Sequence, residues 1–290
     1  MKNLEKLAEL AKSLPAPLNT NASALVEKMG EVLEGFGDKP IEWRPDNLKL
    51  VQATSDRSKL PKSAVIGSLL LGEELVSQPF KVIPLRMDKT RQHWNPDNTK
   101  AQVICSSPDA KTGFLYGDCY SCPHSKFDEV ANRSACNTSL SYLCINAELT
   151  SIFMVNFSKT NYVNGTDWKK SMEKLRLNPY HRYYNLTTET SPKAKNVEIL
   201  KAAGIPGEGK VGGPVLAFVT ELFLWAKQTR IESLENFYHY VEMKKGNSQL
   251  QIGNTTGSEV VMLTDDSEVL PPEEVAAEVK TGTGRKNYSM

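Results

Sequence analysis

Several features are scarce or missing in this sequence, and each absence limits what the protein can be. No apolar run approaches the ~20 residues that a membrane-spanning helix needs. Only four histidines occur among the 290 residues, and no paired carboxylates, Ser-His-Asp set or HExxH motif is present. The sequence therefore predicts no catalytic residues, and we expect that the protein is not an enzyme.

The N-terminal segment lacks the pattern of a targeting peptide. It begins MKNLEKLAELAKSLP, with acidic residues and with leucine repeated at helical spacing, whereas transit peptides are poor in acids and secretory signals have a long apolar centre. Neither sign of charge is in excess, because the formal net charge is +1. We expect a protein that is not uniformly basic and that stays in the reducing cytoplasm.

Cysteine is confined to one short segment. All five cysteines lie between Cys105 and Cys144. An odd number in a long chain without a signal peptide does not indicate a secreted disulfide framework. Cys119-x-x-Cys122 is followed by Pro123 in a loop, whereas a redox-active pair opens a helix after a strand. The segment therefore indicates a metal-binding turn.

The spacing of the cysteines predicts a structural zinc site. One cysteine precedes the Cys-x-x-Cys pair by thirteen intervening residues, and another follows it by thirteen. Four thiolates satisfy tetrahedral Zn²⁺ and leave no position for a reactive water. The predicted ligands are Cys105, Cys119, Cys122 and Cys136. Two alternatives stay open: His124 replaces one cysteine, or Cys144 replaces Cys105. Otherwise Cys144, in the apolar run SYLCI, is interpreted as a buried thiol.

Hydrophobic periodicity predicts the fold class. Residues 3–14 and 22–36 form two amphipathic helices, and residues 165–177 form a third. The β-rich segments between turn residues are 48–55, 65–76, 80–87, 101–105, 142–149, 151–158 and 180–189. This content predicts an α+β, mainly β fold, namely an OB-like five-stranded barrel with an inserted four-cysteine zinc loop and flanking helices.

The chain is expected to consist of three parts. The last part is polar and mostly acidic, which is typical of a disordered tail. The expected boundaries are 1–40 for the N-terminal helices, 41–245 for the OB-like domain, and 246–290 for the tail. Within the domain we expect the zinc-binding insertion at 105–144 and C-terminal helices from Pro214 and over 231–242.

Cations and aromatic rings occur together in four places around the expected barrel. Single-stranded nucleic acid needs both, because cations follow the phosphates and flat rings stack on bases, at ~1–3 kcal/mol per base. Each residue taken alone is explained as well by core packing or by a solvated rim, so it is the clustering that favours binding. The candidate contacts are Arg86, Lys89, Arg91, Trp94, Tyr116, Tyr120, Lys159, Tyr162, Lys169, Lys170, Arg182 and Tyr183.

Six motifs follow one another over about residues 43–190, namely WRPDNLKLVQATS, IGSLLLGEEL, VIPLRMDKTRQHW, CSSPD, YGDCYSCP and FSKTNYVNGTDW. In this order they resemble a family of tailed-bacteriophage early proteins that are described as single-stranded DNA-binding. The resemblance implies an OB-like barrel with a zinc-bearing insertion. It also implies that Cys105, Cys119, Cys122 and Cys136 carry the metal, and that the protein works in phage replication, recombination or transcription in the host cytoplasm.

The sequence favours two functions. The first is sequence-nonspecific binding of single-stranded DNA in replication or recombination, with the acidic tail recruiting replication or transcription proteins. The second is a zinc-ribbon accessory protein that docks on RNA polymerase or on a replication enzyme, with the N-terminal helices and the tail as recruiting elements. Binding that depends on strand length and falls steeply with salt favours the first function.

Overall fold

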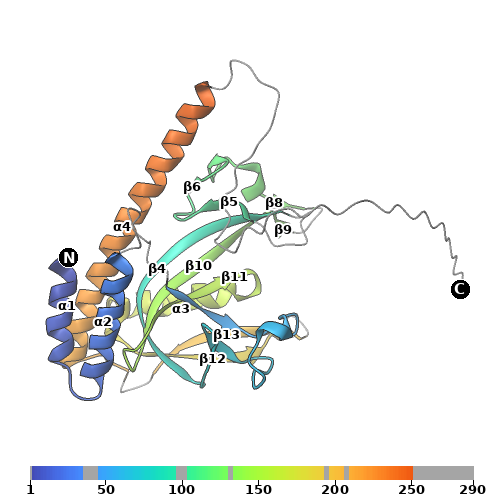
Figure 1. Cartoon of the computed structure of the whole chain (residues 1–290). Helices are drawn as coiled ribbons and strands as arrows, with labels where there is room; N and C mark the ends of the chain where they lie inside the picture. The colour runs from blue at the N-terminus through green and yellow to red at the C-terminus, as the bar shows by residue number, and fades with distance from the viewer. Residues whose placement is uncertain are drawn as a thin grey trace, which may run out of the picture. The chain divides into compact units, whose positions relative to one another are not determined.

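A computed structural model describes residues 2–34, 45–95, 103–129, 133–192, 196–205 and 209–250 (Figure 1). The chain divides into two units, Met1–Lys244 and Lys245–Met290, and all the contacts given below belong to the first. Most of the tail expected at 246–290 lies outside the described residues, although residues 246–250 are helical.

Four α-helices occur in the described part of the chain. The leucine spacing correctly predicts the N-terminal pair, α1 (Lys2–Lys12) and α2 (Leu18–Glu34). The third, α3 (Tyr162–Lys174), begins three residues before the expected helix. Finally, α4 (Gly213–Leu250) is one continuous helix where two were expected. None of these helices is long and apolar enough to cross a bilayer.

Nine strands form a single curled sheet that resembles half of a barrel. Its order is β13-β12-β4-β10-β11-β1-β2-β3, with β5 paired to β4, and only β1 and β11 run parallel. The strands are β1 (Asp46–Leu50), β2 (Leu69–Leu71), β3 (Glu74–Val76), β4 (Phe80–Trp94), β5 (Val103–Ser107), β10 (Cys136–Asn146), β11 (Ile152–Ser158), β12 (Tyr184–Thr190) and β13 (Glu198–Gly204). The α+β, mainly β class is confirmed, but the sheet has nine strands rather than the expected five.

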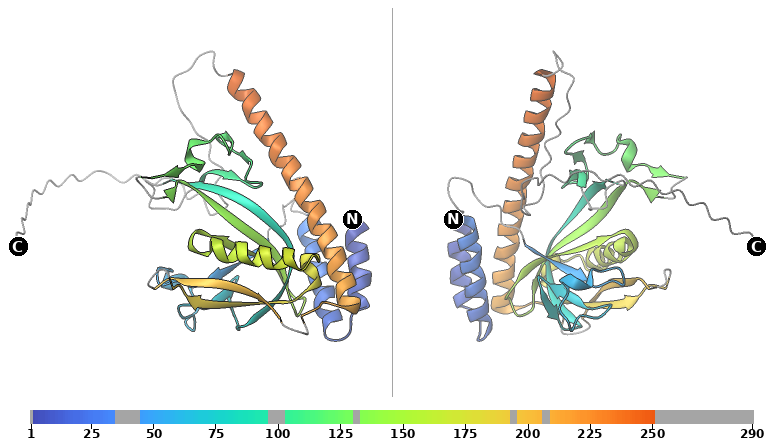
Figure 2. Two further views of the ribbon diagram at one scale, coloured as in Figure 1. Left: turned by 180° about the vertical axis from the view of Figure 1, so that it is seen from behind. Right: turned by 45° about the vertical axis from the view of Figure 1, so that its right-hand side comes forward.

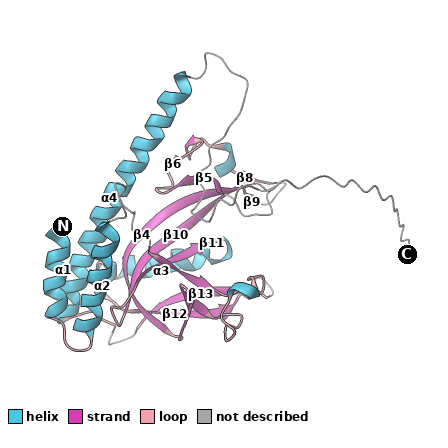
Figure 3. Ribbon diagram, viewed as in Figure 1, coloured by secondary structure: helices cyan, strands magenta, loops and turns pink. Residues whose placement is uncertain are grey.

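The sheet separates two apolar cores. Strand β10 is buried on both faces from Leu140 to Asn146, because its side chains alternate between these cores. Leu143 and Ile145 face helices α1, α2 and α4, in the helix-side core. Leu140, Tyr142 and Cys144 face the inside of the curl, where α3 packs, in the concave core. The helices lie on the corresponding sides of the long strands in Figures 2 and 3.

Cys144 is fully buried in the concave core, which confirms its interpretation as a buried thiol. Burial raises the pKa of this thiol well above its ordinary value. It does not line the cavity that the other four cysteines share.

Two short strand pairs and a 3-10 turn between β5 and β10 carry the cysteine loop. Two-residue strands β6 (Thr112–Gly113) and β7 (Gly117–Asp118) pair with each other, and so do β8 (Phe127–Asp128) and β9 (Arg133–Ser134). A 3-10 turn, η2 (Pro123–Ser125), follows the Cys-x-x-Cys pair. Further single 3-10 turns are η1 (Arg57–Lys59), η3 (Lys159–Asn161) and η4 (Pro179–His181).

Candidate metal centre

Strand β4 forms the floor of the site. It is 15 residues long, and its last part pairs with β5 on one side and with β10 on the other. In that register His93 lies opposite both Cys105 and Cys136. Residues directly opposite one another point to the same face of a sheet. Cys105, His93 and Cys136 therefore form one row across three adjacent strands.

The Cys-x-x-Cys pair sits in a tight turn that Asp118 organises. The Asp118 carboxylate accepts hydrogen bonds from the backbone N–H groups of Tyr120 (3.2 Å) and Ser121 (2.9 Å). Its carbonyl accepts one from the N–H of Cys122 at 3.2 Å. Gly117, just before it, has a φ of +71°, which a residue with a side chain rarely adopts. The sequence correctly predicts this turn.

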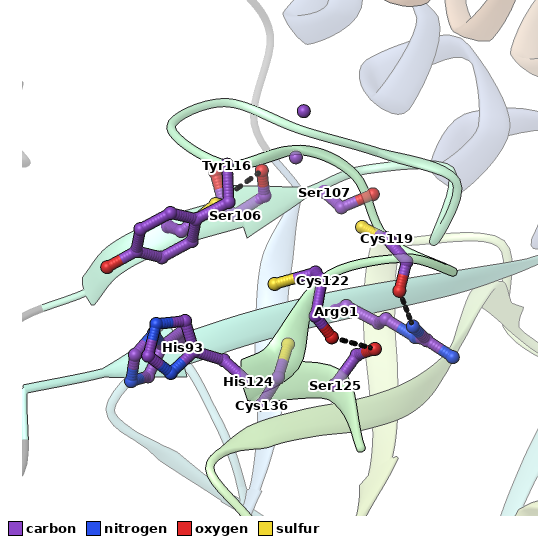
Figure 4. Close-up of a pocket in the computed structure, with 13 residues that line it drawn as sticks. Arg91, His93, Ser106, Ser107, Tyr116, Cys119, Cys122, His124, Ser125 and Cys136 are labelled. Carbon is purple, nitrogen blue, oxygen red and sulfur yellow. Dashed lines mark hydrogen bonds between the residues drawn. The ribbon is translucent and has the colours of Figure 1, made fainter.

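The four thiols line one small cavity together with His93, His124 and Tyr116 (Figure 4). Its volume is about 10 Å³, which is the space that a single water-sized atom needs. Cys105, Cys119 and Cys122 are buried, Cys136 is half-buried, and none is in a disulfide. In the described residues, however, no group of three or more His, Cys, Asp and Glu side chains has the arrangement that could hold an ion.

The backbone approaches the thiols closely at Gly113. A β-carbon on this residue would lie 3.0 Å from Cys105 Sγ and 3.7 Å from Cys119 Sγ. Next to it, the backbone N–H of Leu115 donates a hydrogen bond to Cys105 Sγ at 3.4 Å. A side chain at position 113 would therefore displace a thiol, and glycine leaves the cavity open.

The electrostatics of the cavity disfavour free thiolates. Burial, reinforced by the three neighbouring thiols, raises the pKa of Cys136 to about 11, although Arg91 acts in the opposite direction. At neutral pH such a thiol stays protonated unless a cation stabilises the thiolate. The thiols can therefore bind a cation only by releasing protons to the solvent.

Three aromatic rings close one side of the cavity. The ring centroids of His93 and His124 are 4.3 Å apart, and those of Tyr116 and His124 are 4.7 Å apart. His124 thus lines the cavity, as its proposed role as an alternative ligand requires. The sequence did not reveal His93 as part of this site. No local signal reveals it, because its two neighbours reach it through long-range strand pairing.

Part of the predicted nucleic-acid surface lies on the concave face near this site. Lys89 is exposed and lies opposite Leu140 of the concave core, and Arg91 follows it on the same face. Tyr116, at the cavity, is 40% exposed, and Tyr120, in the turn, is 72% exposed. The structure thus brings two cations and two accessible rings to one end of the sheet.

A second group of candidates is associated with α3 on the same face. Lys159 is exposed, whereas Tyr162 is half-buried and packs against the concave core. Lys169 and Lys170 each form an ion pair with an acid of their own helix, at 3.4 and 4.0 Å. These lysines are accessible to a phosphate, but their charge is partly offset.

The remaining candidates do not join these groups. Arg86 points to the opposite face, where it donates to Asp88 (2.9 Å) and to a backbone carbonyl of α4. Tyr183 packs against the helix-side core, under a lysine side chain. Arg182 and Trp94 are half-buried. The structure therefore does not bring all the candidates to one surface.

Comparison with known protein families, with curated proteins and with solved structures finds no match. The resemblance to tailed-phage early proteins therefore stays a prediction, as do the function and the cytoplasmic location.

Proposed function

We propose that this chain is a single-stranded DNA-binding protein, not an enzyme, whose binding surface is stabilised by a structural Zn²⁺ ion. The observation that carries the proposal is that Tyr120, in the turn of the Cys-x-x-Cys pair, is 72% exposed, with exposed Lys89 on the same end of the sheet. We also propose that the curled sheet functions as an OB-like barrel does: one face of the sheet binds single-stranded DNA.

Zinc suits the donors that line the cavity. Four thiolates bind Zn²⁺ tetrahedrally at about 2.3 Å and leave no open position, so the ion would fix the loop without taking part in chemistry. The supporting observation is that Cys105, Cys119, Cys122 and Cys136 line a space of about 10 Å³, the size of one atom. Small side-chain rotations would then complete the coordination shell.

Stacking on the cysteine loop supplies the binding energy in this proposal. A base on an exposed aromatic ring contributes about 1–3 kcal/mol, regardless of sequence. Tyr116 lies in the β6–β7 turn and Tyr120 in the Cys-x-x-Cys turn. A bound ion would hold both turns in place, so little conformational entropy would be lost on binding. Lys89 and Lys159 supply exposed positive charge for the phosphates.

The biological setting follows from the predicted resemblance. We propose that the protein acts in phage DNA replication or recombination in the host cytoplasm. The tail, 246–290, would recruit replication or transcription proteins through its acidic residues.

The test measures DNA binding by fluorescence anisotropy, with a labelled oligo-dT of about 30 nucleotides and with its duplex. It uses full-length protein whose zinc content has been confirmed. We expect binding to the single strand alone, with an affinity that falls steeply as salt rises. Tyr120→Ala should weaken binding about tenfold, and Tyr120→Trp should preserve it. Lys89→Ala should remove one phosphate contact and so reduce the slope of log affinity against log salt concentration by about 1. The control Lys62→Ala, in the β1–β2 loop, should leave this slope unchanged. No binding at micromolar protein would refute the proposal.

One observation favours the alternative of an accessory protein that docks on RNA polymerase or a replication enzyme. Leu115 and Phe127 of the cysteine loop are 53% and 63% exposed. They are suited to a protein partner more than to a phosphate backbone. Between β5 and β10 the acids also outnumber the basic residues by one; these residues are Asp109, Asp118, Asp128, Glu129, Lys111, Lys126 and Arg133. In that case the chain would co-purify with its partner, and Leu115→Ser would abolish the association.

A further inference from the structure

Two buried nitrogens at the thiol cavity have no hydrogen-bond partner. They are Arg91 Nε and His93 Nδ1, and both residues line the cavity. His93 is only 6% exposed, so water does not readily replace the missing partner. Buried polar groups are nearly always hydrogen-bonded, and those that are not call for a specific explanation. Two such groups at one cavity indicate that it receives a hydrogen-bond acceptor.

The two side chains do not hydrogen-bond to each other, and sulfur atoms are prominent among the acceptors around them. They are alternate residues of β4 on one face, and His124 covers the ring of His93 at a centroid distance of 4.3 Å. The groups lining the cavity that can accept include the sulfur atoms of the four cysteines and several hydroxyl oxygens. Of these, the sulfurs become charged and therefore stronger acceptors when the site binds a cation. One N–H···S bond already exists in the same loop, from the Leu115 backbone to Cys105 Sγ at 3.4 Å.

The net charge of the proposed zinc site also calls for hydrogen-bond donors to the sulfur atoms. One Zn²⁺ ion with four thiolates has a net charge of −2, and a buried charge of this size requires hydrogen-bond donors and a nearby cation. Arg91 is the cation at this cavity. Its Nη1 donates to the carbonyl oxygen of Cys119 at 2.9 Å, which holds the planar guanidinium beside a predicted ligand. The space of about 10 Å³ admits an ion but is too small for a phosphate.

We propose that Arg91 and His93 are positioning residues of the metal centre. The Nε–H of Arg91 and the Nδ1–H of His93 donate hydrogen bonds to metal-bound thiolates, and the guanidinium offsets part of their charge. The inference rests on the proposed four-thiolate site and assigns these residues a role in retaining the ion. It also removes Arg91 from the set of residues that contact DNA phosphates.

The experiment measures zinc release from full-length protein to the chromophoric chelator 4-(2-pyridylazo)resorcinol, together with the absorption spectrum of the Co²⁺-loaded protein. Arg91→Met and His93→Phe retain the bulk of each side chain and remove its donors. Each should release zinc about tenfold faster or more, the size expected when a residue that supports metal ligands is lost. His93→Gln keeps a donor and should lie closer to wild type. The exposed Arg176 provides the matched control, Arg176→Met.

The outcomes distinguish a failure of this inference from a failure of the proposed zinc site. All variants should keep the Co²⁺ spectrum of four-sulfur coordination, because no ligand has been removed. If Arg91→Met and His93→Phe release zinc at the rate of the control, the inference is wrong and the zinc site stands. If His93→Phe changes the ligand-field bands, His93 is itself a ligand, which also overturns the inference. If wild-type protein binds neither Co²⁺ nor Zn²⁺ stoichiometrically, both the inference and the zinc site are wrong.

Discussion

The side-chain amide of Gln52 forms hydrogen bonds with both backbone polar groups of Glu198. Its Nε2 donates to the carbonyl oxygen of Glu198 at 2.7 Å, and its Oε1 accepts from the N–H of Glu198 at 2.9 Å, across 146 residues of sequence. Glu198 begins β13, one end of the strand order, and Gln52 follows β1 near the other end. The amide therefore does what a neighbouring strand would do, and it joins the two sides of the curled sheet.

This contact gives the first prediction. Gln52→Ala leaves two part-buried backbone groups without partners, so the free energy of unfolding should fall by about 2 kcal/mol. Gln52→Glu keeps the acceptor and loses the donor, and should fall in between. Urea denaturation followed by circular dichroism measures both. Gln228→Ala, on the exposed face of α4, is the control and should change stability by less than about 0.5 kcal/mol. Equal effects at the two positions would show that the sheet does not need this closure.

Local patterns in the sequence predicted the elements whose environment is local. The leucine spacing of α1 and α2 reflects one buried face per helix. The turn at Cys119 and Cys122 is set by adjacent residues, including Asp118 and Gly117. For the same reason Cys144, inside an apolar run, was correctly predicted to be buried.

Features that depend on long-range pairing were not predicted. The end of β4, DKTRQHW, is polar and does not look like a strand, yet β5 and β10 pair with it on both sides. That pairing alone places His93 between Cys105 and Cys136. Strand β13 lies outside the segments predicted to be β-rich, and its partner is β12. The order of the nine strands thus depends on contacts between distant segments, whereas hydrophobic periodicity describes each segment separately.

Two helical glycines should respond in opposite ways to alanine. A β-carbon on Gly165 of α3 would lie 2.6 Å from Cβ of Phe157, a side chain that is fully buried. Gly165→Ala should therefore destabilise the protein by about 1–3 kcal/mol despite the better helix propensity of alanine. Around Gly30 of α2 a β-carbon meets nothing within 4 Å. Gly30→Ala should stabilise by about 0.5–1 kcal/mol.

Thermal denaturation of the two variants side by side tests this packing of α3. The comparison is internally controlled, because both substitutions make the same chemical change in a helix. A stabilising effect at both positions would mean that α3 does not pack against β11 as closely as described.

Gly113 should affect the metal more than the fold. Its β-carbon would lie 3.0 Å from Cys105 Sγ and 3.3 Å from the carbonyl oxygen of Gly117, so Gly113→Ala should displace a thiol. We expect the variant to retain zinc poorly while the sheet melts at nearly the wild-type temperature in the presence of chelator. Gly204→Ala is the control, because the nearest atom to its β-carbon is in ordinary contact at 3.8 Å. Zinc per protein, measured by atomic emission, gives the answer; full retention in Gly113→Ala would place the ion away from Cys105.

The last prediction concerns the contact between α4 and the cysteine loop. The hydroxyl of Tyr238 donates to Asp109 Oδ2 at 2.5 Å. The other carboxylate oxygen accepts from the backbone N–H groups of Lys111 and Thr112 at 2.9 and 3.0 Å. Burial acts to raise the pKa of Asp109, but these hydrogen bonds outweigh it and lower the pKa to about 2.

A lowered carboxyl pKa means that the stabilisation is complete above the unfolded-state pKa of about 3.8 and is lost as the pH falls toward about 2. Tyr238→Phe should therefore cost about 1 kcal/mol at pH 6, a value that solvent screening keeps small. The cost should shrink as the pH falls from about 4 to 2. Acid would also displace a metal ion from the proposed site, so the variant is compared with wild type at each pH, which cancels that effect. Tyr120→Phe, at an exposed ring, should show no such dependence; a constant difference between Tyr238→Phe and wild type over this range would mean that Asp109 does not hold α4 to the loop.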